Sequence, residues 1–233
     1  MVEAFGLSHQ GLVRLNNEDR FAGEAAAGWC ALADGMGGAQ AGEIASALAI
    51  QAFTAIVASA PPSELLLREA FLGADRRVRE AADANPKLQG MGTTLVAALE
   101  TPSGLAIGNI GDSRAYLFDG ELRQLTSDQT WANEIGRILG LDEAALRPHP
   151  LRHALTAAVG AGVAERFQNC MVAPRRGDLV LLSSDGLHGV VEAEQIAALL
   201  ADGGSLEEIC NRLIALTLER GAPDNVTVVL ARF

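Results

Sequence analysis

Hydrophobic residues recur along this chain with two different periods, and each period predicts a different kind of element. Segments whose apolar positions repeat every three and four residues are typical of amphipathic helices. The predicted helices run over 41–59, 63–84, 192–200 and 205–219. Pro61 and Pro62 separate the first two of them, and Ser63 is a suitable N-cap for the second. The longer helices therefore come in two consecutive pairs.

Shorter segments that are continuously apolar, or that alternate apolar and polar residues between turns, predict β-strands. These strands cover 2–8, 11–15, 29–33, 93–100, 104–109, 114–118, 121–125, 167–173, 178–183 and 225–233. They cluster in hairpins and do not alternate strictly with helices, which favours an α+β fold over a doubly wound one. We expect two packed antiparallel sheets with the helix pairs outside, and residues 1–233 to form a single domain.

The periodicity weakens between residues 127 and 162, where short helical pieces are predicted over 131–139 and 142–146. Arg147-Pro148-His149-Pro150 follows them. We interpret 127–162 as a flap beside the sheets. His149 and His153 have the spacing of a helical metal pair, but Pro150 between them interrupts a regular helix, so a zinc protease is disfavoured.

Charge and hydropathy exclude several classes of partner. The 18 basic and 29 acidic residues give a net charge of -11, which argues against a nucleic-acid partner bound through a broad basic face. Apolar stretches are too short to span a membrane, and Glu3 stands where a signal peptide needs basic residues, so we expect a cytoplasmic protein without a membrane partner. Cys30, Cys170 and Cys210 lie far apart, as expected for reduced core cysteines.

Carboxylates stand at the ends of several predicted strands. Asp34 and Asp185 each precede a glycine and follow a strand that is apolar on both faces. Taken alone, each is typical of a simple turn. The pattern recurs, however, at Glu18-Asp19, Asp112 and Asp224, and carboxylates that end neighbouring central strands converge on one edge. Their mutual repulsion and their oxygen-only chemistry favour bound Mg²⁺ or Mn²⁺.

Two further residues fit this cluster. Gly35 has no side chain, so its carbonyl can approach a metal ion. Arg14 lies four residues before Glu18 and has two interpretations: it simply pairs with the acidic cluster, or its guanidinium holds a phosphoryl group beside the metal ions.

Six motifs in this order resemble the metal-dependent protein serine/threonine phosphatases, the PPM or type-2C family, in their compact bacterial form. The motifs are Arg14-Leu15-Asn16-Asn17-Glu18-Asp19, Ala33-Asp34-Gly35-Met36-Gly37-Gly38, Gly90-Met91-Gly92-Thr93-Thr94, Gly111-Asp112-Ser113-Arg114, Ser184-Asp185-Gly186-Leu187 and Asp224-Asn225-Val226-Thr227. Each motif is weak alone, but the ordered set is very specific. The resemblance implies a four-layer αββα sandwich, with two antiparallel sheets flanked by helix pairs and a centre of two Mn²⁺ or Mg²⁺ ions at one sheet edge.

The resemblance also implies a role for each matching residue. Asp34 would bridge the two ions, and the Gly35 carbonyl would bind one of them. Asp185 and Asp224 would be direct ligands, and Glu18 would hold a metal-bound water. Arg14 would bind the substrate phosphate, and Asp112 with Asp185 would form the third metal site of bacterial relatives.

The implied activity is hydrolysis of phosphoserine and phosphothreonine in proteins by a metal-activated water, opposing a bacterial Ser/Thr kinase, so the expected partners are phosphorylated proteins. Two alternatives are a catalytically silent phosphoprotein-binding regulator and an esterase for small phosphate monoesters. Two positions depart from the family pattern. Met36 replaces the histidine of animal-type members, which leaves the general acid unassigned, and Gln129 stands where relatives often have histidine.

Overall fold

The computed structural model describes residues 1–37, 41–146, 148–162 and 166–233, so Gly38 and Arg147 of the predicted motif and flap lie outside the described residues. One antiparallel sheet has the order β1 (Glu3–His9), β11 (Val226–Arg232), β10 (Leu179–Ser183), β7 (Arg114–Phe118), β8 (Leu122–Gln124). The other has the order β2 (Asp19–Glu24), β3 (Trp29–Met36), β5 (Leu95–Thr101), β6 (Gly104–Ile110), β9 (Gln168–Val172), and β4 (Gly92–Thr93) pairs with β3.

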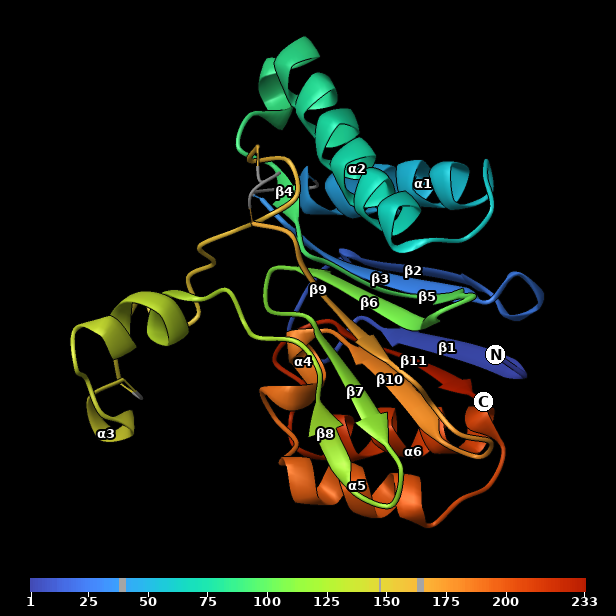
Figure 1. Ribbon diagram of the computed structural model, residues 1–233. Coiled ribbons are helices and arrows are strands. Elements are labelled where there is room, and N and C mark those ends of the chain that lie inside the picture. The colour runs from blue at the N-terminus through green and yellow to red at the C-terminus, as the bar shows by residue number, and fades with distance from the viewer. Residues whose placement is uncertain (38–40, 147, 163–165) are drawn as a thin grey trace.

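Helices cover the outer face of each sheet (Figure 1). The helices α1 (Ala41–Val57) and α2 (Glu64–Ala84) lie on the β2–β9 sheet, and α5 (Ala193–Ala201) and α6 (Leu206–Glu219) lie on the β1–β8 sheet. Ser63 caps α2 by accepting a hydrogen bond from the Leu66 amide at 3.1 Å. The predicted α+β sandwich with two helix pairs is therefore confirmed.

Three hydrophobic cores hold these four layers together, and the central strands supply residues to two of them. Along β3, Trp29 and Ala31 pack toward α1 and α2, whereas Cys30 and Leu32 pack between the two sheets. Because both faces of such strands are buried, their sequences are continuously apolar and do not alternate. The deepest packing includes Phe71 of α2, which is fully buried.

The N-terminal segment differs from the prediction. Residues 11–15 do not form a strand: Leu12, Val13 and Leu15 are exposed, and the segment is a loop that carries Arg14. The second strand is instead β2, which starts at Asp19. The first two strands therefore do not form a hairpin with each other, because β1 pairs with β11 while β2 pairs with β3 in the other sheet.

Smaller differences concern element boundaries. The predicted strand over 93–100 is divided into β4 and β5. The first helical piece of the flap is a π-helix, η3 (Ala132–Gly136), and the second is α3 (Glu143–Leu146). A short helix that the sequence did not predict, α4 (Asp185–His188), begins at one of the candidate carboxylates.

Two expectations drawn from composition concern membrane-spanning helices and the cysteines. No helix in the described ranges is both long and apolar enough to cross a bilayer. Cys30 and Cys210 are buried and Cys170 is half-buried, and none of the three is in a disulfide.

Candidate active site

The predicted site residues meet at one end of the sandwich, where strands of both sheets finish. Asp34 lies near the end of β3, Asp112 follows β6, Asp185 follows β10 and Asp224 precedes β11. Together with Arg14, Glu18 and Gly35, these residues line one pocket of about 540 Å³. The structure therefore brings together all seven residues that the sequence singled out, from five separate segments of the chain.

Hydrogen bonds hold Asp34 in place on both sides of its peptide. Its amide donates to Thr94 Oγ1 at 2.9 Å, and its carbonyl accepts from the Thr94 amide and the Thr93 hydroxyl, both at 2.8 Å. Thr94 Oγ1 also shares a hydrogen bond of 2.7 Å with Ser113 Oγ. The Asp34 side chain consequently projects from a fixed strand end and not from a freely moving turn.

Gly35 is required by close packing. A Cβ atom at this position would lie 2.2 Å from the carbonyl oxygen of Gly42 and 2.8 Å from that of Glu18. Both neighbours are backbone atoms, which cannot move aside as a flexible side chain can. Any side chain here would push apart the strand end that carries Asp34 and the start of α1.

Asp19 is a buried carboxylate for which the sequence prediction gave no role. It pairs with Asp34 across the β2–β3 ladder and is only 2% exposed. Its Oδ2 accepts hydrogen bonds from Thr227 Oγ1 at 2.6 Å and Ser184 Oγ at 2.8 Å, while its buried Oδ1 has no hydrogen-bond partner in the structure. The motif spacing points to the adjacent Glu18, whereas the feature that identifies Asp19 is its burial.

The carboxylates raise one another's pKa. Burial, and then the charges of Asp19 and Asp185, hold the pKa of Asp34 well above its usual range. Burial raises the pKa of Asp112 to about 8, with the charge of Asp185 as the next cause. Burial also raises the pKa of Asp19 to about 6, against the lowering effect of its two hydroxyl partners. Without cations, Asp112 is thus largely protonated at neutral pH, whereas Asp19 is largely ionised.

The pKa values of Asp185 and Glu18 are raised as well. Burial raises the pKa of Asp185, with the charge of Asp224 second, and burial raises that of Glu18, with the charge of Arg14 opposing it. A positive charge placed among these groups would reverse all of these shifts, because it stabilises their ionised forms.

Arg14 pairs with Asp224, at 2.6 Å between Nη2 and Oδ2, and not with the nearer residue in sequence, Glu18. Its side chain is 54% exposed at the rim of the pocket. This hydrogen bond to Asp224 is the largest cause of its raised pKa. One nitrogen of the guanidinium faces the acidic cluster, while the rest of the group is accessible to a ligand in the pocket.

The residues fit a hard divalent cation in their chemistry but do not converge on one point. Within the described residues, no three His, Cys, Asp or Glu side chains form a group that could already hold a metal ion. The acidic side chains of the pocket nevertheless offer oxygen ligands, which hard divalent cations prefer. Behind them, the buried Asp19 Oδ1 has no hydrogen-bond partner, and a cation or its water shell would provide one.

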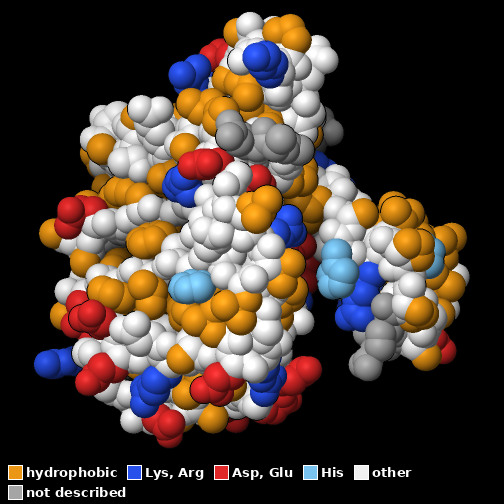
Figure 2. Space-filling model, turned by 180° about the vertical axis from the view of Figure 1, so that it is seen from behind, with side chains coloured by type: hydrophobic (Ala, Val, Ile, Leu, Met, Phe, Trp, Pro, Cys, Tyr) orange, Lys and Arg blue, Asp and Glu red, His pale blue; other side chains and the backbone are white. Residues whose placement is uncertain are grey.

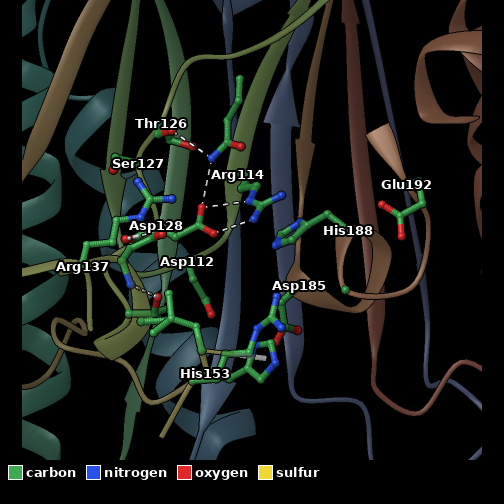
Figure 3. Close-up of a pocket in the computed structure, with 17 residues that line it drawn as sticks. Asp112, Arg114, Thr126, Ser127, Asp128, Arg137, His153, Asp185, His188 and Glu192 are labelled. Atoms are coloured by element: carbon green, nitrogen blue, oxygen red, sulfur yellow. Dashed lines mark hydrogen bonds and ion pairs between the residues drawn. The ribbon is translucent and has the colours of Figure 1, made fainter. Parts of the chain in front are cut away.

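A second, larger pocket of about 810 Å³ opens from the first and lies between the sandwich and the flap (Figure 3). The two share Asp112, His153 and Asp185. Figure 2 shows the flap as a separate lobe, with basic side chains and a histidine turned toward the hollow. Arg137 and His153 come from the flap, and the Asp128–Arg114 ion pair lines the larger pocket but not the smaller one.

The structure gives the positions of the two flap histidines and of the two residues that depart from the family pattern. His149 stacks on Trp131, with ring centroids 4.0 Å apart, whereas His153 lines both pockets. Met36 lies at the edge of the smaller pocket and is 37% exposed. Gln129 is buried, at 1% exposure, and lines neither of these two pockets. His188 is half-buried and lines the larger pocket; its ring hydrogen-bonds to Ser183, and desolvation holds its pKa well below the usual range.

Comparison with known proteins gives matches over nearly the whole chain. The model of the family described as protein phosphatase 2C matches residues 6–217. The serine/threonine protein phosphatase PstP of Mycobacterium tuberculosis is 41% identical over 232 residues, and the match covers 96% of this chain and 43% of that relative. This chain therefore spans less than half the length of PstP.

A shorter relative and a solved structure agree with this match. The serine/threonine phosphatase stp of Listeria welshimeri is 34% identical over 206 residues, covering 85% of this chain and 82% of the relative. The solved catalytic domain of PstP, in complex with two manganese ions, has a TM-score of 0.85 and 38% identity, covering 99% of this chain and 97% of that one. The region of similarity thus includes both sheets and the strand ends that form the pocket.

Proposed function

The chain belongs to the protein phosphatase 2C family, and on that premise we propose that it hydrolyses phosphoserine and phosphothreonine esters in proteins with the help of divalent metal ions. The observation that carries this proposal is the single pocket lined by Arg14, Glu18, Asp34, Asp112, Asp185 and Asp224. The two manganese ions bound by the PstP catalytic domain support Mn²⁺ as the metal.

The carboxylates of the pocket have different roles in binding metal ions. Asp34, Asp185 and Asp224 would hold two ions with the Gly35 carbonyl, while Glu18 would act through a water. Asp112, beside Asp185, is the candidate for a third ion. When bound, such ions supply positive charge for the phosphoryl oxygens and lower the pKa of the attacking water. Asp19, behind Asp34, would bind through its unpartnered Oδ1 to that cluster or to its waters.

Arg14 supplies the group that recognises phosphate. Its guanidinium uses Nη2 to bind Asp224. Because the side chain is exposed, the remaining guanidinium N–H groups can bind a phosphoryl group that enters from solvent. The ion pair also orients the guanidinium in advance, so that less rotational freedom is lost on binding. Arg14 would hold the substrate from the opposite side to the carboxylate cluster and neutralise charge as the ester bond breaks.

The larger pocket gives the substrate class. A single phosphate ester needs only the smaller pocket, whereas the contiguous hollow of about 810 Å³ has room for the residues on either side of a phosphorylated serine or threonine. We infer that a phosphopeptide lies across both pockets and that the flap, over about 127–162, selects among such substrates. Residues 1–233 would then be one catalytic domain.

The proposed reaction indicates which partners and which compartment the protein has. Phosphorylated proteins, made by a bacterial Ser/Thr kinase that this enzyme opposes, are the partners we propose. The cytoplasm is where such kinases find ATP, and three unpaired cysteines are compatible with that reducing compartment.

The test is a phosphatase assay of the purified chain on a phosphothreonine peptide and on a small chromogenic phosphate ester. We expect activity with Mn²⁺, its loss with excess chelator and its return when Mn²⁺ is added back. Full activity in chelator would overturn the metal-dependent mechanism. Binding of the phosphopeptide without turnover would favour a silent regulator, and turnover of the small ester alone would favour a general phosphate monoesterase.

A further inference from the structure

Gln129 lies where the flap joins the sandwich. We define the flap neck as the two segments 129–131 and 154–156, where the incoming and outgoing chains pair. The Thr156 amide donates to the Gln129 carbonyl at 2.9 Å, and the Trp131 amide donates to the Ala154 carbonyl at 2.8 Å, with a β-bridge between Thr130 and Leu155. The flap is thus attached through a short antiparallel pair.

The other side of Gln129 holds the turn that carries Asp112. The Gln129 amide donates to the Gly111 carbonyl at 3.0 Å, and the Gly111 amide donates to Gln129 Oε1 at 2.8 Å. One residue therefore engages both polar groups of Gly111. Because Gly111 directly precedes Asp112, its orientation sets the direction from which the Asp112 side chain enters the pocket.

A third contact extends this attachment into the flap. Gln129 Nε2 donates to the Arg166 carbonyl at 2.6 Å. The Arg166 guanidinium forms an ion pair with Glu134 of the π-helix η3 and lies 3.3 Å from Thr156 Oγ1. Gln129, Thr156, Arg166 and Glu134 thus link the neck to the first helical turn of the flap.

The connection also reaches Asp34. Gly111 has a φ of +104° and packs so closely on Thr94 that a Cβ atom would lie 2.7 Å from Thr94 Cγ2. Thr94 in turn accepts the hydrogen bond from the Asp34 amide. A continuous series of contacts therefore runs from the flap neck through Gln129, Gly111 and Thr94 to the strand end at the centre of the carboxylate pocket.

We propose that Gln129 is a positioning residue that couples the flap neck to the Asp112 turn, so that the flap and the carboxylate pocket keep one fixed relation during the reaction. This inference rests on the proposed phosphatase function. The site needs an acceptor for the Gly111 amide and a donor for the Arg166 carbonyl at the same time, and a neutral side-chain amide supplies both. A glutamate would present an oxygen to the Arg166 carbonyl with no proton between them.

The first test replaces Gln129 by methionine, which has similar length but neither hydrogen bond. We expect Gln129→Met to lower kcat by about 10- to 100-fold on both the phosphopeptide and the small chromogenic ester. KM for the small ester should stay within about threefold, because phosphate recognition belongs to Arg14. Hydrogen–deuterium exchange of the metal-free protein should show at least about tenfold less protection at 109–113.

Thr217→Val provides the matched control. Thr217 is buried in α6, and its hydroxyl donates to the Leu213 carbonyl at 2.9 Å, so this variant also loses a buried hydrogen bond but lies outside the pocket. We expect it to lower the melting temperature without changing kcat or the exchange at 109–113. If Gln129→Met changes kcat no more than Thr217→Val does, or leaves that exchange unchanged, Gln129 is not a positioning residue.

A second pair of variants decides the question if Gln129→Met does not fold. At pH 8, Gln129→His retains one donor and one acceptor on a neutral ring, whereas Gln129→Glu retains only acceptors. The proposal expects Gln129→His to exceed Gln129→Glu in kcat by about tenfold or more. Equal values would overturn it. An inactive wild-type chain would instead overturn the phosphatase function, and the exchange experiment would still show whether Gln129 holds the turn.

Discussion

Removing divalent metal ions should make the stability of this protein fall as the pH rises from 6.5 to 8. The reason is Asp112, which is 7% exposed and whose pKa is raised to about 8 by burial and by the charge of Asp185. In the unfolded chain an aspartate titrates near about 3.9. In this range the folded protein therefore holds a proton that the unfolded chain has already released, so a rise in pH favours unfolding.

The size of the effect follows from proton linkage. A carboxyl group with a folded pKa of about 8 contributes a loss of about 1.5 kcal/mol in the free energy of unfolding between pH 6.5 and 8. For a chain of this length that corresponds to a fall of about 3 to 6 °C in melting temperature. Asp34 adds to the loss, because its pKa also lies well above the usual range.

The lower limit of the pH range is set by His188. Burial holds the pKa of this histidine well below its ordinary value, so its contribution to stability is present above the unfolded pKa of about 6.5 and is lost as the pH falls below it. That contribution has the opposite sign to that of Asp112. As the pH rises above 6.5 the unfolded chain loses its remaining protons from this histidine, so the opposing contribution fades and the carboxylates determine the slope toward pH 8.

The assay is thermal unfolding in excess chelator at pH 6.5, 7.2 and 8.0, repeated with Mn²⁺. Asp112→Asn is the control, because it removes the titrating group, and its chelated form should show a smaller slope. Mn²⁺ should stabilise the wild type more at pH 8 than at pH 6.5, since ligation requires ionised carboxylates. A chelated wild-type protein whose melting temperature is constant or rises over this range would refute the reasoning.

Three further predictions concern activity. Asp34→Asn should lower kcat by about three orders of magnitude with the fold intact by circular dichroism, and a variant within tenfold of wild type would show that Asp34 is only a strand-end residue. Arg14→Ala should chiefly raise KM, with a smaller fall in kcat; a lower melting temperature with unchanged KM would mean that the pair with Asp224 is only structural. Shortening the flap between its neck segments should reduce activity on phosphopeptides far more than on the small chromogenic ester, and equal losses on both would contradict its role in substrate selection.

The central part of the fold could be predicted because its strands are buried on both faces. The runs in β3, β10 and β11 are continuously apolar, since one face of each packs between the sheets and the other beneath helices. The carboxylates at the ends of these strands could be predicted for the same reason, because an acidic residue directly after a buried strand marks the point where the sheet meets solvent.

The edges of the fold could not be predicted in this way. Residues 11–15 have the apolar content of a strand, yet Leu12 and Leu15 are 63% and 91% exposed, because the segment is held by the contact of the Leu12 amide with the Ala222 carbonyl and not by a core. The strand β2 was missed for the opposite reason. It lies at a sheet edge and pairs only with β3, so its sequence, Asp19–Glu24, needs few apolar residues.

The residues that support the site share a physical reason for having been missed. Asp19 is held by Ser184 and Thr227, and Gln129 by Gly111 and Arg166, so the partners of the two lie between 18 and 208 positions away in sequence. Motif spacing reports groups that act together on a ligand, but it carries no information on which distant hydroxyl or carbonyl satisfies a buried side chain. The exchange of histidine for glutamine at 129 therefore looks like a loss from the motif, whereas the structure shows a side chain whose oxygen and nitrogen each have a partner. A departure from a family motif can thus be interpreted only after its hydrogen bonds are known.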